Sequence, residues 1–287
     1  MIARAANANI CLFSFFNSCI FSAFSTLTIM RFYITIALAG ALAAWALAAR
    51  EFVLLGAVAG AFFIVVALGV ALPGMRFFAP FVCRVEIATG RKLVALTFDD
   101  GPDPRSTPRL LELLRARKTP AAFFCIGSRV AENPALVAQI AEDGHLVENH
   151  AYTHSYFSNF YLTARLQREL ERTQAVIEKA AGRAPRFFRP FMGLSNSCTW
   201  RAAQNAGLRV VAWSVRSLDT VIGQPEKVVA RVVRRLHPGA VILLHDGGIP
   251  AEKLTATVGL LLDALRERGY EVARLDELMA KAFSKKL

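Results

Sequence analysis

Acidic side chains stand where an apolar stretch of this sequence ends, and they suit acid–base or metal chemistry. The apolar-rich run 94–97 leads through Phe98 into Asp99 and Asp100, and Gly101-Pro102 then stops regular structure. A strand that delivers carboxylates at its C-terminal end is typical of α/β enzymes. Because neighbouring strand residues point to opposite faces, the two acids need not share one environment. Asp-Gly-Pro is also ordinary turn chemistry, so this stretch alone does not separate a site from a solvated turn.

A histidine pair supplies the second reactive group. His150 and His154 are four residues apart, which on a helical turn places both imidazoles on one side. Two histidines and a carboxylate from another strand make a three-ligand site with open positions, as in catalytic zinc centres or facial-triad iron sites. Taken alone, such a pair more often consists of two unrelated surface imidazoles. We interpret His145 and His237, each beside a turn residue, as structural.

Further reactive side chains follow other inferred strands, in Arg189-Pro190, at Asp219 and in His245-Asp246. From residue 92 onward, strands and helices alternate, which predicts a parallel sheet, open or closed into a barrel. The C-terminal ends of the strands then face one working surface. After the first strand, the predicted strands are 121–126, 146–147, 186–188, 209–215, 240–244 and 270–273. The predicted helices are 107–118, 133–143, 162–181, 199–206, 226–236, 251–268 and 276–283.

The first 82 residues are a hydrophobic region that predicts membrane attachment. Two apolar runs, 32–49 and 52–72, are each about long enough to cross a bilayer core as a helix. Residues 10–30 form a less regular third run, interpreted as an extra span or a signal-like segment. Met30 before an apolar stretch is an alternative start to Met1. Arginines at successive ends have nearly equal weight, so the side of the membrane that the later residues occupy stays open.

The charge and cysteine content limit the classes of binding partner and of covalent cross-link. The net charge is +12, of which the first 90 residues contribute +3 and the remainder +9. A basic surface suits anionic lipid headgroups or a phosphate-bearing substrate. Lysine/arginine blocks with interleaved aromatic residues do not occur, so we discount nucleic acid as a partner. The five cysteines are scattered and odd in number, which is typical of small buried apolar residues and not of a disulfide framework.

The order of the motifs carries a family resemblance. Thr97–Pro102, Asn149–His154, Phe188–Gly193 and Leu243–Asp246 occur in the order found in the polysaccharide deacetylase family (NodB-homology domain, carbohydrate esterase family 4). The segment 122–127 also resembles that family's second-strand signature. The resemblance covers residues 92–287 and implies an α/β fold, a distorted (β/α)7-type barrel of the NodB-homology kind, here preceded by N-terminal transmembrane helices.

The resemblance also implies residue roles, carried over position by position. Asp100, His150 and His154 would hold one divalent metal ion, usually zinc in this family. Asp99 would be the general base that takes a proton from the attacking water, and His245 the general acid that protonates the departing amine. The remaining implied roles are those of Arg189 as partner of Asp99, Asp219 as partner of His245, Pro190 and the Phe191 N–H at the sugar and oxyanion, and Leu243 in the acyl pocket.

Two departures from the family pattern concern substrate preference. Phe191 and Met192 replace the usual proline and aromatic residue, and Thr220 replaces the common tryptophan after Asp219. Neither change touches an implied metal ligand or proton carrier. The implied acyl pocket loses a wall, and a formyl group needs less pocket than an acetyl group, so a deformylase is an alternative.

Three functions compete at this stage. The first is a membrane-anchored, metal-dependent deacetylase of N-acylated amino sugars in a polysaccharide or glycolipid, with membrane lipids as further partners and an open oligomeric state. The second keeps the chemistry but acts on a polyprenyl-linked amino sugar at the cytoplasmic membrane face, as a deacetylase or deformylase. The third is a catalytically inactive glycan-binding membrane protein. Retention of every reactive residue argues against the third, because a binder has no use for a base, an acid and three ligands together.

Overall fold

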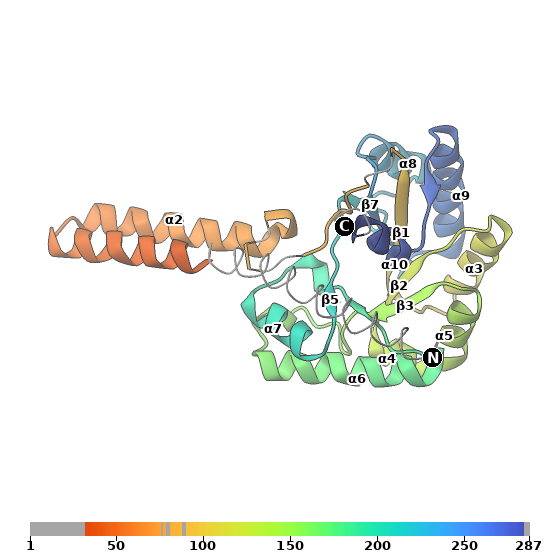
Figure 1. Cartoon of the computed structure of the whole chain (residues 1–287), viewed down its shortest axis with the longest axis horizontal. Helices are drawn as coiled ribbons and strands as arrows, with labels where there is room; N and C mark the ends of the chain where they lie inside the picture. Colours follow the sequence, from red (N-terminus) through yellow and green to blue (C-terminus); the bar gives the residue numbers. More distant parts are fainter. Residues whose placement is uncertain (1–31, 76, 79–80, 88–89, 284–287) are drawn as a thin grey trace, which may run out of the picture. The chain divides into compact units, whose positions relative to one another are not determined.

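The chain divides into two compact units. One comprises residues 1–80 with Leu194–Ser197, and the other comprises Phe81–Gly193 with Cys198–Leu287. The computed structural model describes residues 32–75, 77–78, 81–87 and 90–283 (Figure 1). The predicted segment 10–30 lies outside the described residues.

Apolar helices make up most of the first unit. Helix α2 (Phe52–Ala71) is 20 residues long, has a mean hydropathy of 2.7 and is exposed along nearly its whole length, so it can span a bilayer by length and composition. The helix Phe32–Ala48 is apolar but shorter, and its 17 residues extend about 26 Å, less than a bilayer core of about 30 Å. Only α2 meets the length of a membrane span among the described residues. An apolar helix of this kind serves as an anchor or as a signal sequence.

A parallel sheet forms the second unit, in the strand order β5-β4-β3-β2-β1-β7-β6, with β8 pairing with β1. The central strand β1 (Leu93–Gly101) pairs with β2 (Ala122–Cys125) and β7 (Ala240–His245). The other strands are short: β3 (Leu146–Asn149), β4 (Phe187–Phe188), β5 (Arg209–Val210), β6 (Val215–Arg216) and β8 (Glu271–Val272). This confirms the parallel α/β sheet predicted from the alternation and the distorted barrel implied by the family resemblance.

The sheet curves round because one segment of chain joins its two edges. β5 lies at one edge and β6 at the other, and only four residues separate them in sequence. The Val211 N–H donates to Phe188 on the β4 side, whereas the Ser214 N–H donates to Val241 on the β7 side. The single strand predicted over 209–215 is therefore two strands, since this segment must leave one neighbour and join the other to complete the turn of the barrel.

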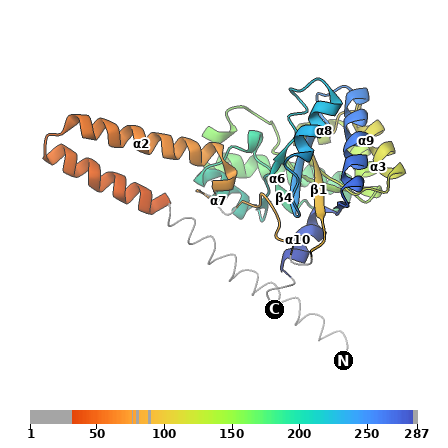
Figure 2. The same cartoon turned by 90° about the horizontal axis from the view of Figure 1, so that it is seen from above.

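Helices cover the outer face of the sheet (Figures 1 and 2). Their apolar sides pack on strand residues such as Leu96, Phe98 and Ile242, whereas Ala95, Phe124 and Val241 belong to a second core cluster. Alternate residues of β1 and β7 thus serve opposite faces. In chain order, the helices of the second unit are α3 (Thr107–Ala116), α4 (Gly127–Glu132), α5 (Pro134–Glu142), α6 (Thr163–Ala181), α7 (Ser197–Asn205), α8 (Pro225–Val233), α9 (Ala251–Glu267) and α10 (Leu275–Phe283), with one-turn helices η2 (Ser158–Phe160) and η3 (Phe191–Gly193). Of these, α10 packs in the second core cluster. The one-turn helix η1 (Pro73–Met75) belongs to the first unit. Helix α4 was not predicted.

Candidate active site

The end of β1 brings both carboxylates to one place. Asp99 continues the strand and lies opposite His245 of β7. The register with β2 then shifts between Asp99 and Gly101, and Asp100 has a positive φ of 70°. A bulge of this kind redirects a side chain next to a site. The strand alternation expected to separate the acids is broken here, because Asp99 Oδ2 and Asp100 Oδ1 lie 3.9 and 3.3 Å from the same nitrogen, His150 Nε2.

Asp100, His150 and His154 form the one group among the described residues with the composition of a three-ligand metal site. Their candidate ligand atoms lie within 4.8 Å of one another, and Asp100 Oδ1 is 2.9 Å from His154 Nε2. His150 Nδ1 is 2.7 Å from the Arg189 carbonyl, so Nδ1 carries the proton and Nε2 presents a lone pair to the cluster. Two imidazole nitrogens and a carboxylate oxygen suit a divalent transition metal. The residues present therefore fit such an ion.

The two histidines converge through a loop and not through a helical turn. Residues 150–154 have no helical assignment, and both Ala151 (φ 62°) and His154 (φ 49°) adopt left-handed backbone conformations. Asn149 at the end of β3 supports the loop, since its side-chain oxygen accepts the Ala151 N–H at 2.9 Å. The prediction of a helical His-x-x-x-His pair was wrong in conformation. Positive φ at a non-glycine residue costs energy, and these tertiary contacts hold the loop in it.

Asp99 and Arg189 form a buried ion pair. Arg189 Nη1 donates to Asp99 Oδ1 at 2.6 Å and to Thr97 Oγ1 at 2.8 Å, and the guanidinium is fully buried. Its Nε and Nη2 donate to the carbonyls of Val211 and Ala212 in the β5–β6 segment. The pairing leaves Asp99 Oδ2 as the oxygen directed toward the histidine cluster.

His245 is held by Asp219 on the other side of β1. Nδ1 of His245 lies 2.8 Å from Asp219 Oδ1, and the His245 N–H donates to Oδ2 at 2.8 Å. Burial opposes the charged imidazolium, but the hydrogen bond and negative charge of Asp219 outweigh it and raise the pKa of His245 to about 9. The ring is therefore protonated at neutral pH, with Nε2 free of this pairing.

The histidine cluster also perturbs its own members. Burial raises the pKa of Asp100, but hydrogen bonds and the charges of His150 and His154 outweigh burial and hold that pKa well below its usual range. For His150, burial lowers the pKa, yet the Asp99 and Asp100 carboxylates raise it overall. Carboxylates and imidazoles this close shift one another's pKa values because each stabilises the opposite charge on its neighbour. Such an arrangement is typical of side chains that bind a cation together.

The residues expected at the substrate lie around this group. Pro190 and Phe191 are buried, and Phe191 begins η3, where a first-turn N–H has no partner within the helix. The Phe191 ring packs edge-on against His154 at 4.5 Å between centroids. Leu243 is buried two residues before His245 on β7, hence on the same strand face. Thr220, which departs from the family pattern after Asp219, is exposed.

Sequence reasoning missed the roles of two buried polar residues. Asp246 lies beside His245 in the Leu-Leu-His-Asp motif, and burial raises its pKa to about 7. Its N–H donates to the Asp99 carbonyl, its Oδ2 accepts from Thr107, and a Cβ on Gly101 would clash with that oxygen. Thr97 contacts Arg189. Both residues occur in the quoted motifs, and that position was the available signal.

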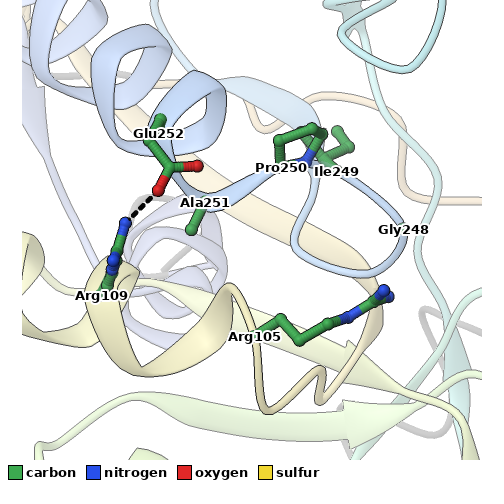
Figure 3. A pocket seen from close by; sticks show the side chains of 7 residues that line it. All are labelled: Arg105, Arg109, Gly248, Ile249, Pro250, Ala251 and Glu252. Atoms are coloured by element: carbon green, nitrogen blue, oxygen red, sulfur yellow. Dashed lines mark hydrogen bonds and ion pairs between the residues drawn. The ribbon is translucent and has the colours of Figure 1, made fainter.

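A separate pocket of about 430 Å³ lies between the start of α3 and the loop that enters α9 (Figure 3). Its charged wall residues are already paired: Arg109 with Glu252, and Arg105 with Asp103 at 2.8 Å. The volume is within the range of small-molecule sites. The pocket wall has one carboxylate, which is paired with Arg109, and so lacks the three grouped ligands of the histidine cluster. The lining residues are Arg105, Arg109, Gly248, Ile249, Pro250, Ala251 and Glu252.

Comparison of the sequence with known proteins gives consistent relatives. Residues 86–211 match the family described as polysaccharide deacetylase. A peptidoglycan-N-acetylglucosamine deacetylase from Bacillus cereus is 37% identical over 196 residues, covering 68% of this chain and 91% of the relative. A chitooligosaccharide deacetylase from Bradyrhizobium sp. is 35% identical over 202 residues, covering 66% and 92%.

Solved structures share the fold. The structure described as T48 deacetylase with substrate is 34% identical with a TM-score of 0.60, covering 66% of this chain and 92% of that one. A pseudoenzyme of carbohydrate esterase family 4 from Bacillus anthracis is 28% identical with a TM-score of 0.64, covering 70% and 69%. The fold is therefore shared by active and inactive proteins, and only the residues of the site distinguish an enzyme from a pseudoenzyme.

Proposed function

We propose, since the chain belongs to the polysaccharide deacetylase family, that it removes N-acetyl groups from N-acetylglucosamine units of peptidoglycan or chitooligosaccharides while attached to a membrane. Polysaccharide deacetylases hydrolyse the C–N bond of an amide. The observation that carries the proposal is the convergence of an Asp-His-His cluster, a buried Asp99–Arg189 pair and an Asp219–His245 pair at the C-terminal ends of neighbouring strands. The substrate class is that of the two relatives' names.

The proposed chemistry divides among this chain's residues as follows. Asp100, His150 and His154 hold a divalent ion, for which we propose Zn²⁺; such an ion supplies Lewis acidity and lowers the pKa of water. Asp99 Oδ2 accepts a proton from the attacking water, while Arg189 donates to Oδ1 and fixes the orientation of the carboxylate. His245 donates a proton from Nε2 to the departing amine.

Substrate placement is assigned to the neighbouring residues. Pro190 and Phe191 line the approach, and the Phe191 N–H faces developing negative charge on the amide oxygen. Loss of one such donor typically costs about 3 kcal/mol of transition-state stabilisation. Leu243 contacts the acyl methyl group.

Membrane attachment rests on α2, whose length and composition suit a span. We propose that residues 1–82 are the attachment region and 92–287 the catalytic domain. A second candidate is a polyprenyl-linked amino sugar that is deacetylated or deformylated at the cytoplasmic face. Thr220 and the Phe191-Met192 departure favour only its change of acyl group and sugar, because they alter the acyl and sugar contacts. Inactive glycan binding is disfavoured because the base, acid and ligand residues are all present.

The direct test of this function is amide hydrolysis by the full-length chain in detergent. Incubation with N-acetylglucosamine oligomers and with peptidoglycan is expected to release acetate and free amine in equal amounts. Product is measured by amine derivatisation and by acetate assay. Binding of either glycan without release of acetate would contradict the proposal and favour the inactive alternative. Release of formate from an N-formyl sugar alone would favour the deformylase.

Replacement of Asp219 by asparagine is expected to move the alkaline limb of kcat/KM downward. Asp219 raises the pKa of His245 to about 9, so the wild-type acid is lost as the pH rises through about 9. Without the carboxylate, the limb should fall toward the ordinary imidazole pKa of about 6.5. Activity at pH 8 should then fall by at least about tenfold, which follows from that displacement.

Thermal unfolding checks the same linkage. Because the folded pKa of His245 is raised, the pair contributes its full stability below about pH 6.5 and loses it as the pH rises through about 9. Asp219→Asn should remove this pH dependence. Asp263→Asn, which removes a surface carboxylate paired with Arg117, is the matched control and should leave the pH profile unchanged. An unchanged alkaline limb in Asp219→Asn would exclude His245 as the acid.

A further inference from the structure

An exposed apolar segment directly follows the metal-site histidine. We call residues 155–162 the aromatic loop. Its side chains Tyr156, Phe157, Phe160 and Leu162 are 78%, 70%, 83% and 75% exposed. In the described part of the catalytic unit, only three other large apolar side chains are exposed: Met192, Val221 and Leu260. Concentration of exposed apolar groups in one segment marks an interaction surface.

The outward direction of these side chains is built into the loop. Several of its backbone N–H groups have partners within the loop: the Ser158 N–H donates to the Ser155 carbonyl, the Phe160 N–H to the Phe157 carbonyl, and the Phe157 N–H to the Ser155 hydroxyl. The short helix η2 lies within the loop and has no buried residues. With backbone polar groups satisfied locally, the loop can enter an apolar environment at lower cost.

The aromatic loop is also joined to the active site. The Tyr156 ring packs edge-on against Phe191 at 4.9 Å, and Phe191 packs against His154 at 4.5 Å. Whatever the loop contacts is therefore held near the metal-ligand cluster. Tyr161 at the far end of the loop packs instead under the guanidinium of Arg165, 3.7 Å from its ring centroid.

Basic residues border the apolar tip. Helix α6 begins at Thr163, immediately after the loop, and carries exposed Arg165, Arg168 and Arg172 at spacings that place them on one face. Arg172 lies over the ring of Tyr152 at 3.6 Å. Two acidic residues lie between these arginines. The Glu169 carboxylate accepts from the Thr153 N–H and hydroxyl, and the exposed Glu171 carboxylate accepts from the Gln167 amide.

We propose that the aromatic loop and the α6 arginines form a membrane-contact surface, which inserts Phe157, Phe160 and Leu162 among the headgroups of an anionic bilayer. Aromatic and leucine side chains beside arginines are typical of interfacial binding, and basic residues near an anionic surface are attracted to it. A sugar-stacking platform is the competing occupant. Leu162 has no ring to stack on a sugar, and guanidinium groups match lipid phosphate in charge and geometry.

The proposed surface has a function separate from deacetylation: it orients the catalytic unit relative to the membrane. It would hold the strand ends, and so the Asp-His-His cluster, toward the lipid surface, and it favours substrates whose amino sugar lies near headgroups. Contact with lipid does not require turnover, so it can be tested even in a chain that hydrolyses no glycan.

The test uses the full chain in nanodiscs, with Phe157→Trp as the probe. Difference spectra against the parent chain remove the emission of Trp45, Trp200 and Trp213. In discs containing phosphatidylglycerol, the emission of the introduced indole should shift to shorter wavelength and be quenched by brominated acyl chains. Leu260→Trp, on α9, which lies apart from α6 in Figure 1, is the matched control and should show neither effect.

Charge is tested in the same probe background. Arg165→Gln combined with Arg168→Gln should reduce the quenching, and so should replacing phosphatidylglycerol by phosphatidylcholine or raising the salt concentration. Equal quenching of the Leu260 probe would overturn the proposal. An emission change on adding N-acetylglucosamine oligomers in detergent, with no lipid quenching in discs, would overturn it in favour of a sugar platform.

Discussion

Replacement of Asp99 by asparagine is expected to lower kcat on N-acetylglucosamine oligomers by about 10²- to 10⁴-fold, the range supplied by a positioned general base. Oδ1 of Asp99 is held by Arg189 at 2.6 Å, so only Oδ2 faces the histidine cluster. An amide at this position cannot accept the proton. The metal should stay bound, because Asp100, His150 and His154 are unchanged. Steady-state kinetics together with metal content by atomic spectroscopy measure both outcomes.

The same variant should be less stable, and this must be separated from the kinetic effect. Removing one partner of a buried ion pair typically costs about 3–5 kcal/mol, here because Arg189 would remain fully buried without its carboxylate. Thr97→Val is the matched control, since it removes the other side-chain acceptor of Arg189 but leaves Asp99 in place. It should lower the melting temperature with a much smaller loss of kcat. Loss of metal from Asp99→Asn would contradict the division of roles between the two acids.

The alternation of strands and helices, the parallel sheet and the residues at its strand ends could be predicted from the sequence, whereas the local backbone geometry could not. Alternating apolar segments and turn residues suffice to place Asp99, His150 and His245 at strand ends, because parallel strands present their C-terminal ends together. The bulge at Asp100 could not be foreseen. It depends on Asp246 packing where a side chain on Gly101 would lie, a contact between residues far apart in the sequence.

The histidine loop and the β5–β6 segment failed prediction for a related reason. Spacing of four residues is read as helical, yet His150 and His154 meet through left-handed residues stabilised by Asn149 and by hydrogen bonds from Gly127 and Ser128. The run 209–215 is apolar nearly throughout, which gives no local signal for a change of partner. Tertiary context decides both, as it commonly does for short elements.

In the apolar N-terminal region, by contrast, the local sequence was enough to predict the helices. Composition alone identified helices at 32–49 and 52–72, and the structure has helices at Phe32–Ala48 and Phe52–Ala71. A long apolar run without charged residues predicts such a helix from local sequence alone, with no need for tertiary contacts. Length then distinguishes them, since only α2 reaches that of a membrane span among the described residues.

Removal of divalent ions is expected to abolish hydrolysis and to lower the melting temperature, because an ion that binds only the folded chain stabilises it, by about 2.7 kcal/mol at 100 times its Kd. His150 is buried, and its Nδ1–H donates a hydrogen bond to the Arg189 carbonyl, which orients the ring. His154 is partly exposed. His150→Ala should therefore weaken metal binding more than His154→Ala, and by more than the 10- to 100-fold (about 1.4–2.7 kcal/mol) typical of losing an outer partner.

Metal titration by calorimetry after chelator dialysis, with activity restored by zinc, cobalt, nickel or manganese in turn, measures affinity and identifies the ion that supports turnover. Affinity should fall as the pH is lowered, since an imidazole must be neutral to bind a cation. His237→Ala removes an imidazole outside the cluster and should behave as the parent chain does. Turnover that survives complete chelation would rule out the metal mechanism. Asp99 and His245 would then act as an acid–base pair that does not depend on the histidine cluster.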